Sequence, residues 1–122
     1  MSDYILEDVS HNEPLWSESD PVRPNLGPDF KTAPGRGVFG LRSSSGEWKA
    51  FMCYARTCDV PKDVKDIETY TDESGNFCIP YSVWSKEKGS GRSIINEVLC
   101  FIGETDNGID RVITLSPLTD MA

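Results

Sequence analysis

The sequence predicts a mixed α/β fold (α+β) built on a single mixed sheet, and two patterns carry this prediction. Residues 38–55 are typical of an antiparallel β-hairpin. Residues 77–115 indicate a strand, a helix and a second strand in succession. A strand joined through a helix to another strand of the same sheet makes a right-handed crossover between parallel strands. A hairpin beside such a crossover gives a sheet of mixed direction.

The length, composition and charge of the chain exclude several classes of function. The chain has 122 residues, which suits one domain or part of one, and 38% of them are hydrophobic, as in ordinary globular proteins. Twenty acidic against twelve basic residues give a formal charge of −8, which argues against nucleic-acid and anionic-membrane partners. No apolar run approaches the roughly 18 residues of a membrane helix. The acidic N-terminus does not resemble a signal peptide, so a cytoplasmic protein is expected.

The cysteines predict no metal site. Cys53, Cys58, Cys78 and Cys100 form no close C-x-x-C pair, and the one histidine, His11, lies in a polar segment. Because three of the four lie in apolar runs, they are expected to be buried, reduced thiols.

Residues 1–36 are predicted to form an extended, proline-rich arm. Five prolines exclude a long helix from this segment. Trp16, Leu26 and Phe30 are the expected anchors of the arm onto the domain, which is assigned to residues 37–122.

The domain begins with the hairpin. Val38–Leu41 and Trp48–Ala55 are its predicted strands, with the turn at "RSSSG". The run Ala50–Ala55 is apolar on both faces, which indicates a central strand. A polar connector follows, in which Pro61 is the expected start of a short helical turn.

The next strand, "FCIPYSVWS", contains a proline. Phe77, Ile79, Tyr81 and Val83 fall on one face at a period of two. Pro80 has no N–H to donate to a neighbouring strand, so we expect a bulge or a local opening of the sheet there.

An amphipathic helix is predicted to follow and to end near Gly103. Its apolar stripe consists of Ile94, Ile95, Val98, Leu99 and Ile102. "DRVITLSP" is the last strand, with Val112, Ile113 and Leu115 as a short buried run.

A basic glycine loop separates that strand from the helix. Lys86, Lys88 and Arg92 surround Gly89 and Gly91. The first N–H groups of a helix have no intrahelical partner, and the helix dipole places partial positive charge there. Glycine lets the backbone approach a phosphate closely, so this loop is a candidate anion site, although such a sequence is also typical of a solvated turn.

Two familiar phosphate motifs do not fit the loop. "GSGRS" lacks the Walker pattern G-x-x-x-x-G-K-[ST]. The dinucleotide fingerprint G-x-G-x-x-G needs a third glycine, where this chain has Ile94. A nucleotide-binding module therefore ranks last.

The stretch "KEKGSGRSIINEVL" resembles the pyrophosphate loop of the GNAT superfamily of acyl-CoA N-acyltransferases, with its signature [QR]-x-x-G-x-[GA]. Lys86, Gly89 and Gly91 fill its first, fourth and sixth positions. "VFGL", "SGEWKAFMCYAR", "IPYSVW" and "RVITLSPLTDMA" resemble the second to fifth strands of that fold. The set is similar to acetyltransferase-like proteins of marine cyanobacterial phages, which would place it in a host cytoplasm.

The chain departs from the family pattern at three points. Lys86 stands where Gln or Arg is usual, and the connection from Val83 to Gly89 is about two residues shorter than the commoner spacing. The sequence ends at Ala122, before the helix and last strands that the family carries. The resemblance thus implies a truncated domain without the tyrosine that often acts as general acid.

The resemblance implies that acetyl-CoA is the co-substrate and an unidentified amine the acceptor. Its fourth and fifth strands splay apart around the pantetheine. The implied cofactor-binding residues are Val83, Trp84, Lys86, Lys88, Gly89, Ser90, Gly91, Arg92 and Ser93. Trp84 is equally compatible with a core position on the reverse face of its strand.

Direct attack of an amine on the thioester needs a base and a donor for the leaving thiolate. Glu68, Asp72 and Glu73 are candidate bases, and Ser116 is a candidate for orienting substrate or water. A solvated acidic loop and a helix-entry serine explain the same residues.

A second hypothesis is a catalytically inactive, small acidic phage-type protein that binds a host or viral protein. Binding of CoA separates it from the first. A sheet that ends after Leu115 leaves an exposed edge, so a homodimer or a partner that completes the sheet is expected.

Overall fold

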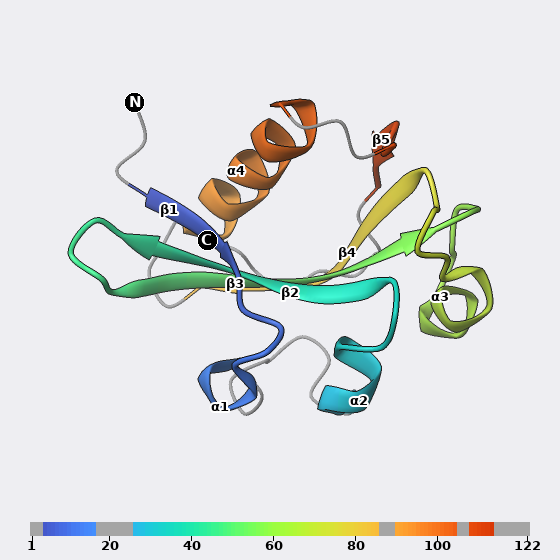
Figure 1. Cartoon of the computed structure of the whole chain (residues 1–122), viewed down its shortest axis with the longest axis horizontal. Coiled ribbons are helices and arrows are strands. Elements are labelled where there is room, and N and C mark those ends of the chain that lie inside the picture. The colour runs from blue at the N-terminus through green and yellow to red at the C-terminus, as the bar shows by residue number, and fades with distance from the viewer. Residues whose placement is uncertain (1–3, 17–25, 86–89, 105–107, 114–122) are drawn as a thin grey trace.

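Five strands form one mixed sheet in the order β1-β2-β3-β4-β5 (Figure 1). The computed structural model describes residues 4–16, 26–85, 90–104 and 108–113. Neighbouring strands are antiparallel from β1 to β4, and β5 is parallel to β4. The predicted α+β fold, its hairpin and its parallel crossover are therefore confirmed. The strands are β1 (Tyr4–Asp8), β2 (Arg36–Ser43), β3 (Trp48–Thr57), β4 (Phe77–Ser85) and β5 (Arg111–Val112).

Helices lie on both faces of the sheet (Figure 1). The longest, α4 (Ser90–Glu104), covers the face that carries Leu41, Met52 and Val83, which is called the α4 face below. The opposite face carries Phe51 and Ile79 and is called the α1–α3 face. Its covering helices are α1 (Glu13–Trp16), α2 (Pro28–Lys31) and α3 (Val64–Tyr70).

The N-terminal segment is tied to the sheet more closely than an arm would be. Tyr4–Asp8 pairs with β2 and forms an edge strand, which the sequence analysis missed. The predicted anchors are confirmed: Trp16 is fully buried, and Leu26 and Phe30 pack against the core of the α1–α3 face. In the described part of this segment α1 and α2 have four residues each, and no long helix forms there.

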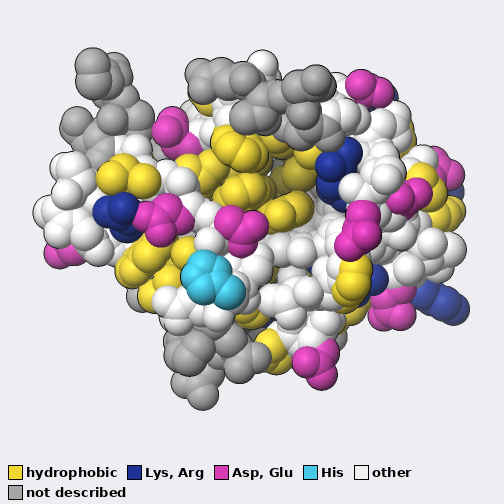
Figure 2. Space-filling view, viewed as in Figure 1, with side chains coloured by type: hydrophobic (Ala, Val, Ile, Leu, Met, Phe, Trp, Pro, Cys, Tyr) yellow, Lys and Arg dark blue, Asp and Glu magenta, His cyan; other side chains and the backbone are white. Residues whose placement is uncertain are grey.

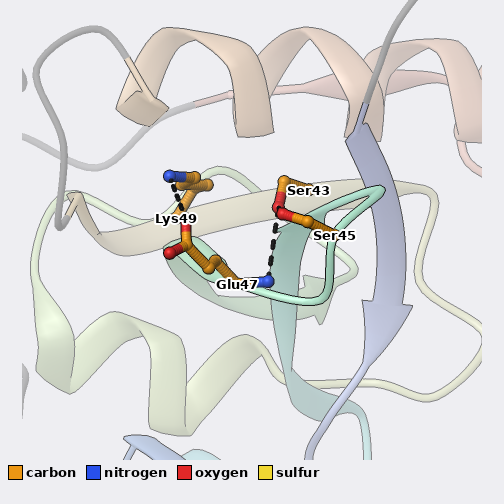
Figure 3. A network of polar contacts seen from close by, with 4 residues as sticks. All are labelled: Ser43, Ser45, Glu47 and Lys49. Carbon is orange, nitrogen blue, oxygen red and sulfur yellow. Dashed lines mark hydrogen bonds and ion pairs between the residues drawn. The ribbon is translucent and has the colours of Figure 1, made fainter.

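The hairpin turn between β2 and β3 is held by polar side chains (Figure 3). The Ser43 hydroxyl accepts a hydrogen bond from the Glu47 amide at 3.3 Å and contacts the Ser45 hydroxyl at 2.8 Å. The Lys49 ammonium lies 2.9 Å from a Glu47 carboxylate oxygen and lowers the pKa of that carboxyl, first by its hydrogen bond and then by its charge. These contacts close the turn at the place the sequence predicts.

The central strand matches its prediction, whereas the short helix of the connector begins at Val64 and not at Pro61. Ala50–Cys53 is completely buried, as expected for a strand covered on both faces. In the connector, α3 begins at Val64, because the Asp63 carboxylate caps it by accepting the Asp66 amide at 2.9 Å. Ile67 is the residue of this helix that reaches the core.

Strand β4 contains the expected bulge. Cys53 lies opposite Ser82 and Tyr54 lies opposite Pro80, so Tyr81 is the extra residue. Because Tyr81 and Ser82 then share a face, the alternation of side chains is shifted by one position after the bulge.

The shift corrects one prediction. Ile79 and Tyr81 belong to the core of the α1–α3 face, whereas Val83 lies on the α4 face and packs with Ile94 and Val98. The extra residue therefore breaks the strict two-residue alternation of side chains along β4.

The apolar stripe of α4 is narrower than predicted. Ile94 and Val98 are buried, and Ile95 and Ile102 are half-buried. Leu99 is 45% exposed, because the sheet covers one side of the helix and Leu99 is turned about 100° from Val98.

The four cysteines all lie in the described part of the chain and form no disulfide there, and they divide by exposure. Cys53 and Cys78 are buried, as expected. Cys100 is exposed on α4, which corrects its predicted burial, and Cys58 is exposed as well.

The last strand is shorter in the described part of the chain than its apolar run. It comprises Arg111–Val112, and Ile113 packs against the core of the α1–α3 face. Leu115 lies outside the described residues. None of the described helices combines the length and the apolar character that a membrane crossing requires.

Candidate functional site

The predicted cofactor residues cluster in sequence at one end of the sheet, where β4 leads into α4. Val83 and Trp84 are buried near the end of β4. Ser90 and Gly91 open α4, followed by the exposed Arg92 and the half-buried Ser93. Lys86, Lys88 and Gly89 fall in 86–89, outside the described residues, as does Ser116.

The pairing of β4 changes along its length. β5 pairs with it at Phe77 and Cys78 only, and the Ile113 amide donates to the Cys78 carbonyl at 2.9 Å. From Ile79 to Ser85, the described residues pair β4 with β3 alone. Backbone N–H and C=O groups on such an edge are able to bind an extended ligand.

A buried hydroxyl lies at the bulge on this strand. Ser82 is fully buried, and its Oγ has no hydrogen-bond partner among the described residues. A buried polar group of this kind is uncommon and costs free energy, so it calls for a functional or structural explanation. No sequence motif marks Ser82, which is buried because β4 is covered on both faces.

The candidate bases lie elsewhere on the molecule. Glu68 is exposed on α3, and Asp72 and Glu73 are exposed in the turn that follows. This turn leads into Phe77 at the start of β4, whereas Val83 lies six residues further along, a distance of about 20 Å in an extended strand. The described residues therefore do not bring these carboxylates together with the predicted acyl site.

A pocket of about 160 Å³ lies on the α4 face, beside the end of α4 and the approach to β5. Figure 2 shows a hollow between these elements with hydrophobic side chains on its walls and a basic side chain at its margin. We call it the α4 pocket. It is lined by Phe39, Tyr54, Arg56, Cys78, Phe101, Ile102 and Ile109.

Aromatic rings form the walls of this pocket. The rings of Phe39 and Tyr54 stack with centroids 4.9 Å apart. Phe101, which is 46% exposed, meets Phe39 edge-on at 5.9 Å. The arrangement leaves a ring-lined surface beneath the end of α4.

Two ionisable groups in the pocket are held neutral. Burial raises the pKa of the Cys78 thiol to about 12, with the Arg56 guanidinium acting in the opposite direction. Burial also raises the pKa of the Tyr54 hydroxyl to about 12, assisted by the negative charge of Asp8 and by that of Cys78 once this thiol ionises, and opposed by Arg56. At neutral pH both groups are therefore uncharged.

These pKa values predict a loss of stability at alkaline pH. The ordinary pKa is 9.0 for cysteine and 10.0 for tyrosine, so the unfolded chain releases both protons before the folded chain does. The free energy of unfolding should then fall from about pH 9 to pH 12, at most about 1.4 kcal/mol per pH unit for Cys78. Urea unfolding between pH 8 and 10 measures this slope.

A cysteine pair supplies the control for this prediction. Cys78→Ala should flatten the slope between pH 9 and 10, whereas Cys58→Ala, at an exposed thiol, should leave it unchanged. An unaltered slope in Cys78→Ala would show that another group causes the alkaline loss.

No local sequence motif marks the α4 pocket. Its lining residues come from β2, β3, β4, α4 and the segment before β5. They are scattered along the chain, so they form no motif of neighbouring residues. Only Phe101, an apolar residue off the predicted stripe of α4, gave a local signal.

Within the described ranges, no group of three or more His, Cys, Asp or Glu side chains is arranged to hold a metal ion. A comparison with models of known protein families finds no match for the chain, and a comparison with curated proteins finds none either.

Proposed function

We propose that the chain binds acyl-CoA and acts as an N-acyltransferase, or as the cofactor-binding part of one, with acetyl-CoA as donor and an amine as acceptor. The observation that carries the proposal is that, among the described residues, β5 pairs with β4 at Phe77 and Cys78 alone. The GNAT resemblance implies a pantetheine in the gap between its fourth and fifth strands. The described part of β4 offers such an edge from Ile79 to Ser85.

The order of elements gives independent support. The sequence resemblance counts a second, third, fourth and fifth strand but assigns no first strand. Tyr4–Asp8 fills that position as β1, antiparallel to β2. The helix α4 and the parallel β5 then follow β4 in the implied order.

The start of α4 supports an anionic end to the ligand. Ser90 and Gly91 stand in its first turn, where backbone N–H groups lack intrahelical acceptors. No acidic residue lies in that first turn, and Arg92 is exposed there. A pyrophosphate at this end would gain hydrogen bonds and charge complementarity.

The reaction would be a direct aminolysis. The amine nitrogen attacks the thioester carbonyl, so a C–N bond forms, the C–S bond breaks and CoA leaves as a thiolate. The amine loses a proton and the thiolate gains one. Glu68, Glu73 and Ser116 stay predictions for these proton transfers, and the described geometry favours none of them.

A calorimetric titration with acetyl-CoA at moderate salt tests the proposal. The parent chain is expected to bind in the micromolar range, and Gly89→Glu with Gly91→Glu should abolish binding, because side chains and negative charge then occupy the predicted phosphate site. Gly27→Glu with Gly103→Glu is the matched control, since it adds the same charge where an added Cβ has nothing within 4 Å.

No binding by the parent, or equal loss in the control, would contradict the cofactor site. The partner-binding protein would then be the better hypothesis. Binding without turnover on any amine would leave a CoA-binding protein that lacks catalysis.

A further inference from the structure

We propose that the α4 pocket is a second ligand site, which binds a small, single-ring aromatic carboxylate. The pocket is separate from the proposed CoA site. Cys78 in its wall pairs with β5 at the start of β4, whereas Val83 and Trp84 lie near the opposite end of that strand. The inference therefore does not depend on acyl transfer.

The volume of the pocket limits the size of the ligand. An apolar cavity of about 150 Å³ accommodates one benzene ring, and the α4 pocket measures about 160 Å³. The stacked pair Phe39 and Tyr54 and the edge-on Phe101 present ring faces and edges to it. A flat aromatic ring satisfies these surfaces better than a branched aliphatic group does, because ring pairs favour offset and edge-to-face contact.

The guanidinium of Arg56 favours a negatively charged group on the ligand. The Arg56 Nε donates to the Gly75 carbonyl at 2.8 Å, which holds the guanidinium in place at the wall. Its outer nitrogen lies near the backbone of Gly108, where an added Cβ would stand 3.3 Å away. The side chain of Arg56 thus extends from β3 toward the segment that carries Ile109.

Charged side chains of β1 and β3 influence the ionisable groups of the pocket. The positive charge of Arg56 acts on both Cys78 and Tyr54, whereas the negative charge of Asp8 acts on Tyr54. Arg56 lines the pocket together with the stacked rings of Phe39 and Tyr54, so the proposed ligand places its carboxylate beside Arg56 and its ring against those two rings. Guanidinium–carboxylate pairing is strong in such partly desolvated places.

Benzoate is the probe, added to the full-length ¹⁵N-labelled chain and followed by amide shifts. Saturable shifts are expected at Phe39, Cys78, Ile102 and Ile109, with affinity in the roughly millimolar range of so small a ligand. Benzyl alcohol and benzylammonium are the comparators of the same ring, and each should bind at least tenfold more weakly.

Two tryptophan variants on one helix locate the site. Ile102→Trp fills the pocket and should weaken benzoate binding at least tenfold, whereas Leu99→Trp, at an exposed position of α4, should change it less than twofold. Arg56→Gln should reduce the preference for benzoate over benzyl alcohol, and Arg56→Lys should retain part of it. Circular dichroism checks that each variant folds.

Three outcomes would overturn the proposal. The first is the absence of saturable shifts at tens of millimolar benzoate. The second is a set of shifts outside the pocket, or shifts that Ile102→Trp leaves intact. The third is benzylammonium binding as tightly as benzoate, which would contradict the carboxylate assignment even if the ring binds. If Ile102→Trp does not fold, the parent's shift map and the Arg56 pair decide the matter.

Discussion

Replacing Gly75 by alanine is expected to lower the free energy of unfolding by roughly 3–5 kcal/mol, a large share of the stability of a small domain. Gly75 is buried in the turn between α3 and β4. A Cβ built on it would stand 2.3 Å from the Thr57 carbonyl oxygen, 2.5 Å from the Thr57 carbonyl carbon and 2.8 Å from the Thr57 nitrogen. Chemical denaturation followed by circular dichroism measures the loss.

A change of side-chain rotamer cannot relieve the clash, because the added Cβ would meet backbone atoms of Thr57. Thr57 belongs to β3, where it lies opposite Phe77 in the ladder with β4. If the turn moves instead, it gives up the hydrogen bond from the Gly75 amide to the Asp72 carbonyl at 2.8 Å. It also gives up the bond from the Arg56 Nε to the Gly75 carbonyl, which fixes a wall of the α4 pocket.

The control for Gly75 is the same substitution at Gly103. Gly103 lies in the last turn of α4, and an added Cβ there has nothing within 4 Å. Because alanine favours a helix over glycine by up to about 1 kcal/mol, Gly103→Ala should be neutral or stabilising. Equal stability of the two variants would show that the turn at Gly75 repacks without cost.

Local patterns predicted the parts of the fold in which each residue's role is decided by its neighbours in sequence. The hairpin and the amphipathic helix both carry such signals, and the structure confirms them. The doubly apolar run Ala50–Ala55 predicted the central strand, because burial on both faces removes the alternation of a half-exposed strand. All of this run is buried except Tyr54, which is half-buried.

The prediction at Pro80 was right about the bulge but wrong about its consequence. A missing N–H signals a break in the ladder, yet it does not say which residue becomes the extra one. Tyr81 takes that place, and the face of Val83 changes as a result. The face of the sheet on which a side chain lies depends on how two strands pair, so the sequence of one strand alone does not determine it.

Features made by distant segments escaped the sequence analysis. The strand β1 is five residues long and gains its pairing from β2, which begins 28 residues after β1 ends. The α4 pocket depends on the packing of four elements and the approach to β5. The predicted cofactor loop, by contrast, is a motif of adjacent residues, so the sequence could propose it although residues 86–89 are not described.

Replacing Trp16 by alanine is the second change with a large expected effect, a loss of roughly 3–5 kcal/mol in the free energy of unfolding. Trp16 is fully buried in the core of the α1–α3 face, and its indole Nε1 donates to the Val9 carbonyl at 2.8 Å. The four-residue helix α1 is too short to be stable by itself, so this side chain holds the segment after β1 on the sheet. Urea unfolding at neutral pH measures the loss.

Two further variants separate the contributions of Trp16. Trp16→Phe keeps an aromatic ring but leaves the Val9 carbonyl without the indole donor, so it should cost less, roughly 1–3 kcal/mol. Leu99→Ala removes an apolar side chain that is 45% exposed, and it should cost less than about 1 kcal/mol. If Trp16→Ala costs no more than Leu99→Ala, the segment between β1 and α2 is not anchored by this ring, and β1 must hold its place through its pairing with β2 alone. If Trp16→Phe costs as much as Trp16→Ala, the hydrogen bond to Val9, and not the burial of the ring, fixes the segment.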